Sequence, residues 1–275
     1  MKLTRLIKLI FLVPLIFFLG ISLVNATSIA NIKGWVDWST FQVSVDGNSP
    51  NYNEDGKNSY SQANADYDDA YPPAIEIWGN PVPGSGLWGT TDAITTTPLN
   101  AQGHAWTNED LIRAEAYARA DGIINTYAVA SAFVYRIGYF LVSENSTFNA
   151  SVTFNLEQFF NYNPSFETVG GYNFIRIGLG RIVPGQGTVT VTDDKKEFSY
   201  NSNNGDLNGL WTSSETLSII GYPLEGGYTY AVDVAINSSA NCSTRAIAPV
   251  PEPATMLLLG SGLIGLAGLR KKFKK

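Results

Sequence analysis

Apolar and polar residues alternate along much of the interior of this chain, and this pattern predicts β-strands. Residues 147–156 show it most clearly, because one face of that run carries Phe148, Ala150, Val152, Phe154 and Leu156. Further strand-like runs occupy residues 34–45, 188–192, 196–200, 217–221 and 228–236. Asp193 and Asp194 are expected to form a hairpin turn between two of these runs. One face of the last run carries Tyr230, Val232, Val234 and Ile236.

Residues 107–121 fit two patterns. Thr107 and Asp110 have the spacing of a capping box, which would begin a helix. From Ile112 to Ala120, however, every second residue is apolar, and a helix would scatter these alanines around its axis. We therefore expect a strand here. The following run, residues 123–142, predicts one or two more strands with an inward face formed by Phe133, Tyr135, Ile137, Tyr139 and Leu141.

The strand runs together predict an all-β fold, an antiparallel β-sandwich of jelly-roll-like type, over residues 27–236. Residues 46–73 are rich in Asn, Asp, Ser, Tyr and Gly and are expected to form a loop insertion, and residues 79–86 a second irregular stretch. Residues 237–250 have the small and polar composition of a linker.

The N-terminus has the features of a signal peptide. Lys2, Arg5 and Lys8 precede an apolar stretch, which predicts a signal helix. Val24 and Ala26 stand at the −3 and −1 positions of a signal-peptidase site, so residues 1–26 are expected to be removed. The alternative is a retained N-terminal membrane helix.

The C-terminus, residues 251–275, has three consecutive parts. Pro251, Glu252 and Pro253 are followed by 16 uncharged residues, 254–269, and then by a basic end. As a helix, the apolar part would reach about 24 Å, slightly less than a hydrocarbon core of about 30 Å, and snorkelling basic side chains can make up the difference. A C-terminal membrane helix is therefore expected, with its basic end in the cytoplasm.

This order of parts resembles the PEP-CTERM sorting signal of exported bacterial proteins. The resemblance implies recognition by an exosortase, with cleavage near Pro251, Glu252 and Pro253. It also implies a Gram-negative envelope and association with exopolysaccharide or a biofilm matrix. The alternative is a single-pass anchor that is never cut. The body ahead of the tail is similar to uncharacterised β-sandwich bodies, and that similarity brings no known activity.

The charge of the body argues against nucleic-acid binding, and its cysteine content excludes an internal disulfide. Without the two termini the chain has ten Lys and Arg against 23 Asp and Glu, a net charge of about −13. Such an acidic body would repel nucleic acid. Cys242 is the only cysteine, so no internal disulfide can form, and we expect it to be buried.

Motifs for catalysis are few. His104 is the only histidine and is expected to be a loop or surface residue, no G-x-S-x-G occurs in the body, and one His with one Cys is too few for a four-ligand zinc site. Acidic residues are plentiful, so a glycosidase carboxylate pair remains an alternative. The leading hypothesis is a non-enzymatic surface or matrix protein.

Two further features suggest ligands. Asn51, Asn53 and Asp55 resemble the start of a calcium-binding loop, although Gln62 replaces the bidentate glutamate. Most tryptophans are expected in the core, but Trp78 and Trp88 flank the Pro/Gly stretch and are candidate glycan contacts. The runner-up hypothesis is a secreted carbohydrate-binding module using these tryptophans, with calcium as its possible ion.

Overall fold

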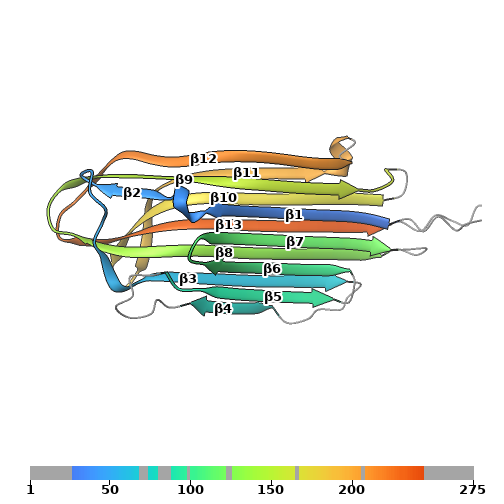
Figure 1. Ribbon diagram of the computed structural model, residues 1–275, viewed down its shortest axis with the longest axis horizontal. Coiled ribbons are helices and arrows are strands. Elements are labelled where there is room, and N and C mark those ends of the chain that lie inside the picture. Colours follow the sequence, from blue (N-terminus) through green and yellow to red (C-terminus); the bar gives the residue numbers. More distant parts are fainter. Residues whose placement is uncertain are drawn as a thin grey trace, which may run out of the picture. The chain divides into compact units, whose positions relative to one another are not determined.

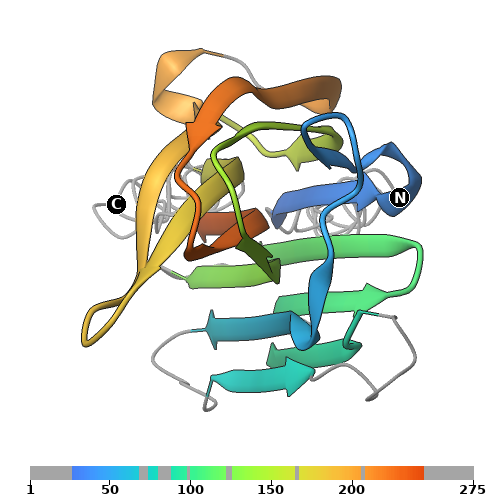
Figure 2. The ribbon, with the colours of Figure 1, turned by 90° about the vertical axis from the view of Figure 1, so that its left-hand side faces the viewer.

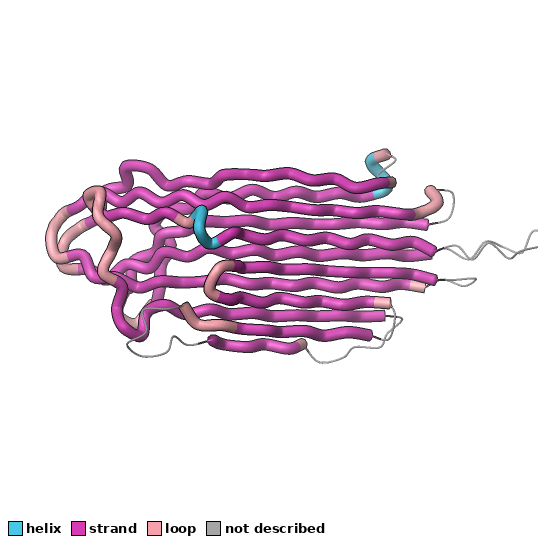
Figure 3. The backbone as a smooth tube through the Cα atoms, in the orientation of Figure 1, coloured by secondary structure: helices cyan, strands magenta, loops and turns pink. Residues whose placement is uncertain are grey.

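The computed structural model describes residues 27–67, 74–79, 88–97, 100–121, 126–164, 167–205 and 208–244. Nearly all of this body is strand (Figure 3). The elements, in chain order, are β1 (Thr27–Asp37), η1 (Trp38–Thr40), β2 (Gln42–Val45), β3 (Tyr52–Tyr67), β4 (Ile75–Gly79), β5 (Thr91–Thr97), β6 (Ala101–Asn108), β7 (Leu111–Asp121), β8 (Tyr127–Val142), β9 (Ser146–Asn161), β10 (Glu167–Val183), β11 (Gly187–Asn201), η2 (Ser202–Asn204), β12 (Gly209–Leu224) and β13 (Tyr228–Thr244).

The strands form two sheets, which confirms the predicted all-β sandwich. Sheet A has the order β12-β9-β1-β7-β6-β5, with β2 also paired to β9, and sheet B has the order β11-β10-β13-β8-β3-β4. Every pairing between named strands is antiparallel. Figure 1 shows the strands running side by side, and Figure 2 looks along them. Side chains on each strand alternate between the interior and the outer faces, as the period-two pattern requires.

The interior contains two clusters of different composition. One, the large-residue core, includes Phe140, Phe148, Phe154, Ile175, Ile177, Leu179, Leu217 and Ile236. The other, the alanine-rich core, includes Ala30, Ala65, Ala101, Ala116, Ala118, Ala120, Ala128, Ala130, Ala240 and Cys242. The predicted inward faces of β9 and β13 both belong to the large-residue core. Cys242 is buried as expected.

Strand β7 resolves the ambiguity at residues 107–121 in favour of a strand. It pairs with both β1 and β6, and its inward side chains from Ile112 to Ala120 are fully buried. The sheets come unusually close beside these alanines. A methyl group placed on Gly103 of β6 would lie 2.4 Å from the Ser131 carbonyl oxygen and 2.6 Å from the Asn64 carbonyl oxygen, both in the other sheet. Only small side chains fit between the sheets at this point.

The predicted inward face of β8 was wrong. Phe133, Tyr135, Ile137 and Tyr139 are only partly covered, and Leu141 is exposed. The buried set is the opposite one, with Ala128, Ala130, Ala132, Val134, Arg136, Phe140 and Val142. The reason is steric, because β6 and β7 of the facing sheet leave room for alanines and not for a row of aromatic rings.

Two segments predicted to be interrupted are continuous strands. Most of the expected loop insertion at residues 46–73 is β3, which pairs with β8 and turns Ser59, Ser61, Ala63 and Ala65 inward. The expected turn at Asp193 and Asp194 is absent, because β11 pairs with β10 on both sides of these residues. Both aspartates lie within the ladder, where Asp194 Oδ2 accepts the Ser218 backbone N–H at 2.9 Å.

The linker prediction was wrong for its first eight residues. Strand β13 continues through Thr244 and pairs with β10 and β8 along this part. Small polar side chains are compatible with this ladder, since Ser238 is buried and its Oγ donates to the Ala114 carbonyl at 3.1 Å. The rest of the predicted linker, residues 245–250, lies outside the described residues, as do the predicted signal and membrane helices.

Candidate functional site

Trp88, one of the two predicted glycan contacts, lies within a group of aromatic rings. Its ring centroid is 5.1 Å from that of Trp38, 5.8 Å from that of Tyr52 and 6.4 Å from that of Phe41. Trp38 and Phe41 stack on each other at 4.5 Å. Gly138 makes this packing possible, because a methyl group there would lie 2.5 Å from the Tyr52 ring and 2.9 Å from the Trp88 ring. We call these four rings the Trp88 cluster.

Two cations lie against the Trp88 cluster. The Arg136 guanidinium carbon is 4.6 Å from the Trp38 ring centroid and 5.7 Å from that of Trp88. Lys57 Nζ is 5.2 Å from the Tyr52 centroid and 6.0 Å from that of Trp88. All four distances are within the range of cation–π attraction.

Arg136 is fully buried, which is unusual for an arginine. Its Nε donates to Ser59 Oγ at 3.3 Å, and its Nη2 donates to the Asn108 carbonyl, which joins the two sheets. Its Nη1 has no hydrogen-bond partner among the described residues. Burial lowers the pKa of Arg136 to about 10, and the nearby Asp110 charge partly opposes this shift.

These contacts give Trp88 a packing role. Its ring makes edge or T-shaped contacts with Trp38, Tyr52 and Phe41, two cations lie near it, and the residue is half-buried. A glycan contact at Trp88 stays a prediction. Trp78 lies on β4 opposite Tyr60, and its side chain is outside the described set.

The expected tryptophan core is not observed. Trp35, Trp38, Trp88 and Trp106 are all half-buried, and Trp211 is 47% exposed. The interior is instead filled by Phe, Ile, Leu, Val and Ala.

His104 is a partly exposed surface residue, although it lies on strand β6 and not in a loop. Its Nε2 is 2.7 Å from Asp92 Oδ1, and its ring stacks on Trp106 at 4.0 Å between centroids. Because neighbouring residues of a strand point to opposite faces, Asp92 is exposed while Thr91 is buried.

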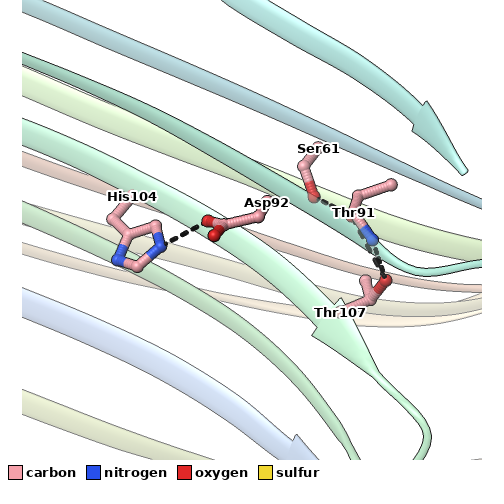
Figure 4. A network of polar contacts seen from close by, with 5 residues as sticks. All are labelled: Ser61, Thr91, Asp92, His104 and Thr107. Carbon is pink, nitrogen blue, oxygen red and sulfur yellow. Dashed lines mark hydrogen bonds and ion pairs between the residues drawn. The ribbon is translucent and has the colours of Figure 1, made fainter.

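A second group of polar side chains lies on the inner side of the same strands. Ser61 and Thr91 are hydrogen bonded, and Thr91 Oγ1 lies 3.2 Å from Thr107 Oγ1 (Figure 4). All three hydroxyls are buried, whereas His104 and Asp92 face outward. A nucleophile needs its base within hydrogen-bond reach, so these two groups do not form a catalytic triad.

The predicted calcium residues do not form a twelve-residue loop. Residues 57–62 are extended and paired with β8, whereas a calcium loop must curl around the ion. Asn51 and Asn53 are exposed, and the Asp55 side chain is not described. Among the described residues no group of three or more His, Cys, Asp or Glu side chains could hold a metal ion. The geometry gives the calcium prediction no support.

Sequence reasoning missed Arg136 as the centre of this region. The sequence did contain a signal for Arg136. In a strand it falls on the same face as Ala128, Ala130, Ala132 and Val134, and a charge within a row of small apolar residues indicates a buried polar contact. Because the apolar pattern of residues 123–142 predicts the opposite face as inward, it places Arg136 on the outer face.

The predicted processing residues, Val24, Ala26, Pro251, Glu252 and Pro253, lie outside the described residues, and so does the apolar run 254–269. In the part of the chain that is described, no helix is long and apolar enough to cross a membrane.

Comparison with known proteins gives one finding about the tail. A family profile described as the PEP-CTERM protein-sorting motif matches residues 249–272. A search of curated proteins found no match for this chain. The matched range contains Pro251, Glu252 and Pro253, together with the apolar run and the first basic residues after it. The chain therefore carries a PEP-CTERM protein-sorting motif behind a β-sandwich body, which implies an exported protein that is sorted by an exosortase.

Proposed function

We propose that this protein is a non-enzymatic component of the surface or extracellular matrix of a Gram-negative bacterium. The sorting motif at residues 249–272 is the observation that carries the proposal. In this account residues 254–269 hold the protein in the membrane until an exosortase acts near Pro251, Glu252 and Pro253. The sandwich body is then released or attached outside the cell, in contact with exopolysaccharide.

The body supports a structural role. Long antiparallel strands, several of them 15 to 17 residues, form almost all of it. The single histidine faces away from the buried hydroxyls of Ser61, Thr91 and Thr107, so it does not form a nucleophile and base pair with them. A protein with these properties is suited to bearing load or presenting a surface, and its acidic charge favours solubility.

The mass of the mature protein tests the sorting step. We expect protein isolated from its host to lack residues 1–26 and everything beyond the Pro-Glu-Pro sequence. In a strain without its exosortase the tail should remain. Glu252→Gln, or Pro253→Ala, should also leave the tail in place, whereas Glu144→Gln, an exposed carboxylate of the body, should not. An intact tail in the wild-type host would contradict the proposal.

A separate experiment tests the non-enzymatic part. The protein should release no reducing ends from a panel of bacterial polysaccharides. Hydrolysis that one Asp or Glu substitution abolishes would show a glycosidase instead.

A further inference from the structure

A polar pocket lies on the outer face of sheet B, close to the residues where β13 ends and β8 begins. Its volume is about 220 Å³. The residues that line it come from four strands and from η2, and they are Tyr127, Thr168, Val169, Asn201, Asn203, Asn241, Cys242 and Ser243. No feature of the sequence had marked these residues, which are spread over more than 100 positions.

Strand register explains how these residues meet. Ser243 pairs with Tyr127 on one side and with Thr168 on the other, which gives one row across three strands. In the adjacent row Gly170 lies between Asn241 and Asn201. Because Gly170 has no side chain, the row has a gap between Asn241 and Asn201, two of the residues that line the pocket. The Asn241 amide leans into that gap, since a methyl group on Gly170 would lie 2.4 Å from Asn241 Oδ1.

Several of the lining groups are hydrogen bonded within the protein. Thr168 Oγ1 and Ser243 Oγ are hydrogen bonded at 2.6 Å, and Asn201 Oδ1 accepts the Asn203 backbone N–H at 2.9 Å. Asn241 is exposed, and its amide makes no hydrogen bond to the described residues. Tyr127 is 48% exposed and contributes an aromatic ring. The pocket thus combines hydrogen-bonded walls with the exposed Asn241 amide and the partly exposed Tyr127 ring.

The chemistry of the lining selects a class of ligand. Carboxamides donate and accept hydrogen bonds, and hydroxyls do the same, so together they complement a ligand rich in hydroxyl groups. The tyrosine ring offers an apolar surface to the C–H groups of such a ligand. None of the lining residues is charged. A phosphate, a carboxylate or a cation would lose its hydration here without gaining a counter-charge, which is unfavourable.

We propose that this pocket binds one neutral hexose unit of a glycan. Its volume is below the range of about 300–1,000 Å³ that is typical of pockets for drug-sized ligands, so it suits a single ring and not an oligosaccharide. Tyr127 stacks on the sugar ring, and Asn241 binds hydroxyl groups at its edge. The inference stands on the pocket alone and does not depend on how the tail is processed.

Binding of neutral sugars to the full-length protein in detergent tests the proposal. Glucose, galactose and mannose are titrated one at a time and followed by NMR, with glucuronic acid as the charged comparison. At least one neutral hexose should bind in a saturable manner. Tyr127→Ala and Asn241→Ala should each weaken its affinity at least fivefold. The control is Tyr228→Ala, because Tyr228 is 43% exposed and lies at the other end of β13.

The outcomes separate clearly. Tyr127 and Asn241 are exposed, so the variants should keep the melting temperature of the wild type, and this is measured on the same samples. Absence of binding by all three hexoses, equal loss in Tyr228→Ala, or tighter binding of glucuronic acid would each overturn the proposal. None of these results alters the mass measurement that tests sorting, so the two proposals can fail independently.

Discussion

The large-residue core and the alanine-rich core hold the same two sheets together in different ways. In the large-residue core, Phe148 and Phe154 of sheet A meet Ile175 and Ile177 of sheet B, and bulky side chains fill the space between the sheets. In the alanine-rich core most side chains are alanines, alongside Ile32, Phe160, Tyr162 and Val169, and each alanine contributes one methyl group, worth about 0.8 kcal/mol, against roughly 1.5–3 kcal/mol for a large side chain. The sheets compensate by lying closer, as the contacts at Gly103 show.

This comparison shows that apolar burial can be obtained either from volume or from proximity. A region that depends on volume should be sensitive to the removal of atoms. A region that depends on proximity should tolerate truncation better but should resist the addition of atoms. Two substitutions test this difference, and a third probes a buried carboxyl group at the end of the sandwich that holds the alanine-rich core.

The largest effect is expected in the large-residue core. Phe154→Ala should lower the free energy of unfolding by about 3–5 kcal/mol, because it leaves a cavity where the surrounding rings cannot collapse. Urea denaturation measures the change. Phe159→Ala is the matched control on the same strand, since Phe159 is partly exposed and its loss should cost less than about 1 kcal/mol. Equal effects of the two substitutions would contradict the assignment of the core.

Gly103→Ala should give the second largest change in the free energy of unfolding. Whether the variant is stabilised or destabilised tests how closely the sheets approach. In an ordinary strand this substitution stabilises by about 0.5–1 kcal/mol, because glycine loses more entropy on folding. Here the added methyl group meets the backbone of the opposite sheet, so we expect destabilisation of about 1–3 kcal/mol. The same denaturation assay reports the result. A stabilised variant would show that the sheets can separate at no cost.

The smallest effect is expected at Glu167, at the end of the sandwich that holds the alanine-rich core. Its side chain is buried, and Oε1 has no hydrogen-bond partner among the described residues. Burial raises the pKa of Glu167, and the Asn163 N–H, donating to Oε2 at 2.5 Å, partly counteracts the shift. Just above the ordinary glutamate pKa the folded protein therefore binds more protons than the unfolded chain, so this group's contribution to stability falls as the pH rises.

Glu167→Gln removes the fall in stability with rising pH, because glutamine does not ionise. It keeps a side-chain oxygen that can accept the Asn163 N–H. The variant should be more stable than the wild type at pH 7 by about 0.5–1 kcal/mol, and the gain should shrink at pH 4. Unfolding curves of both proteins at the two pH values give the comparison. A gain that does not change with pH would assign the effect to packing and not to charge.

The sequence predicted the strands far better than it predicted which face of each strand is buried. Period-two alternation correctly identified β7 and β9 because it is a local property of the chain. It gave the wrong face for β8, since both faces are apolar and the choice depends on the alanines of β6 and β7. Strand β3 was missed because its inward residues, such as Ser59 and Ser61, are small and polar.

The candidate binding residues were less predictable because they also depend on strands that are distant in the sequence. The partners of Arg136 lie 28 and 77 residues away in the chain, and the pocket at Tyr127 depends on register among four strands. The sorting tail was predictable because its signal consists of consecutive residues, which need no folded neighbour. Features that consist of adjacent residues can be read from one sequence, and features that depend on strand register cannot.

The position of Cys242 gives this protein an internal reporter of opening. The thiol donates to the Ala118 carbonyl at 3.2 Å, and burial raises its pKa to about 12. A thiol this weakly acidic does not react with alkylating reagents at neutral pH while the sheets stay together. Outside the cell it can neither exchange disulfides nor link two copies of the chain. Covalent labelling of Cys242 would thus report the fraction of intact molecules in which β13 has separated from β7 at least once.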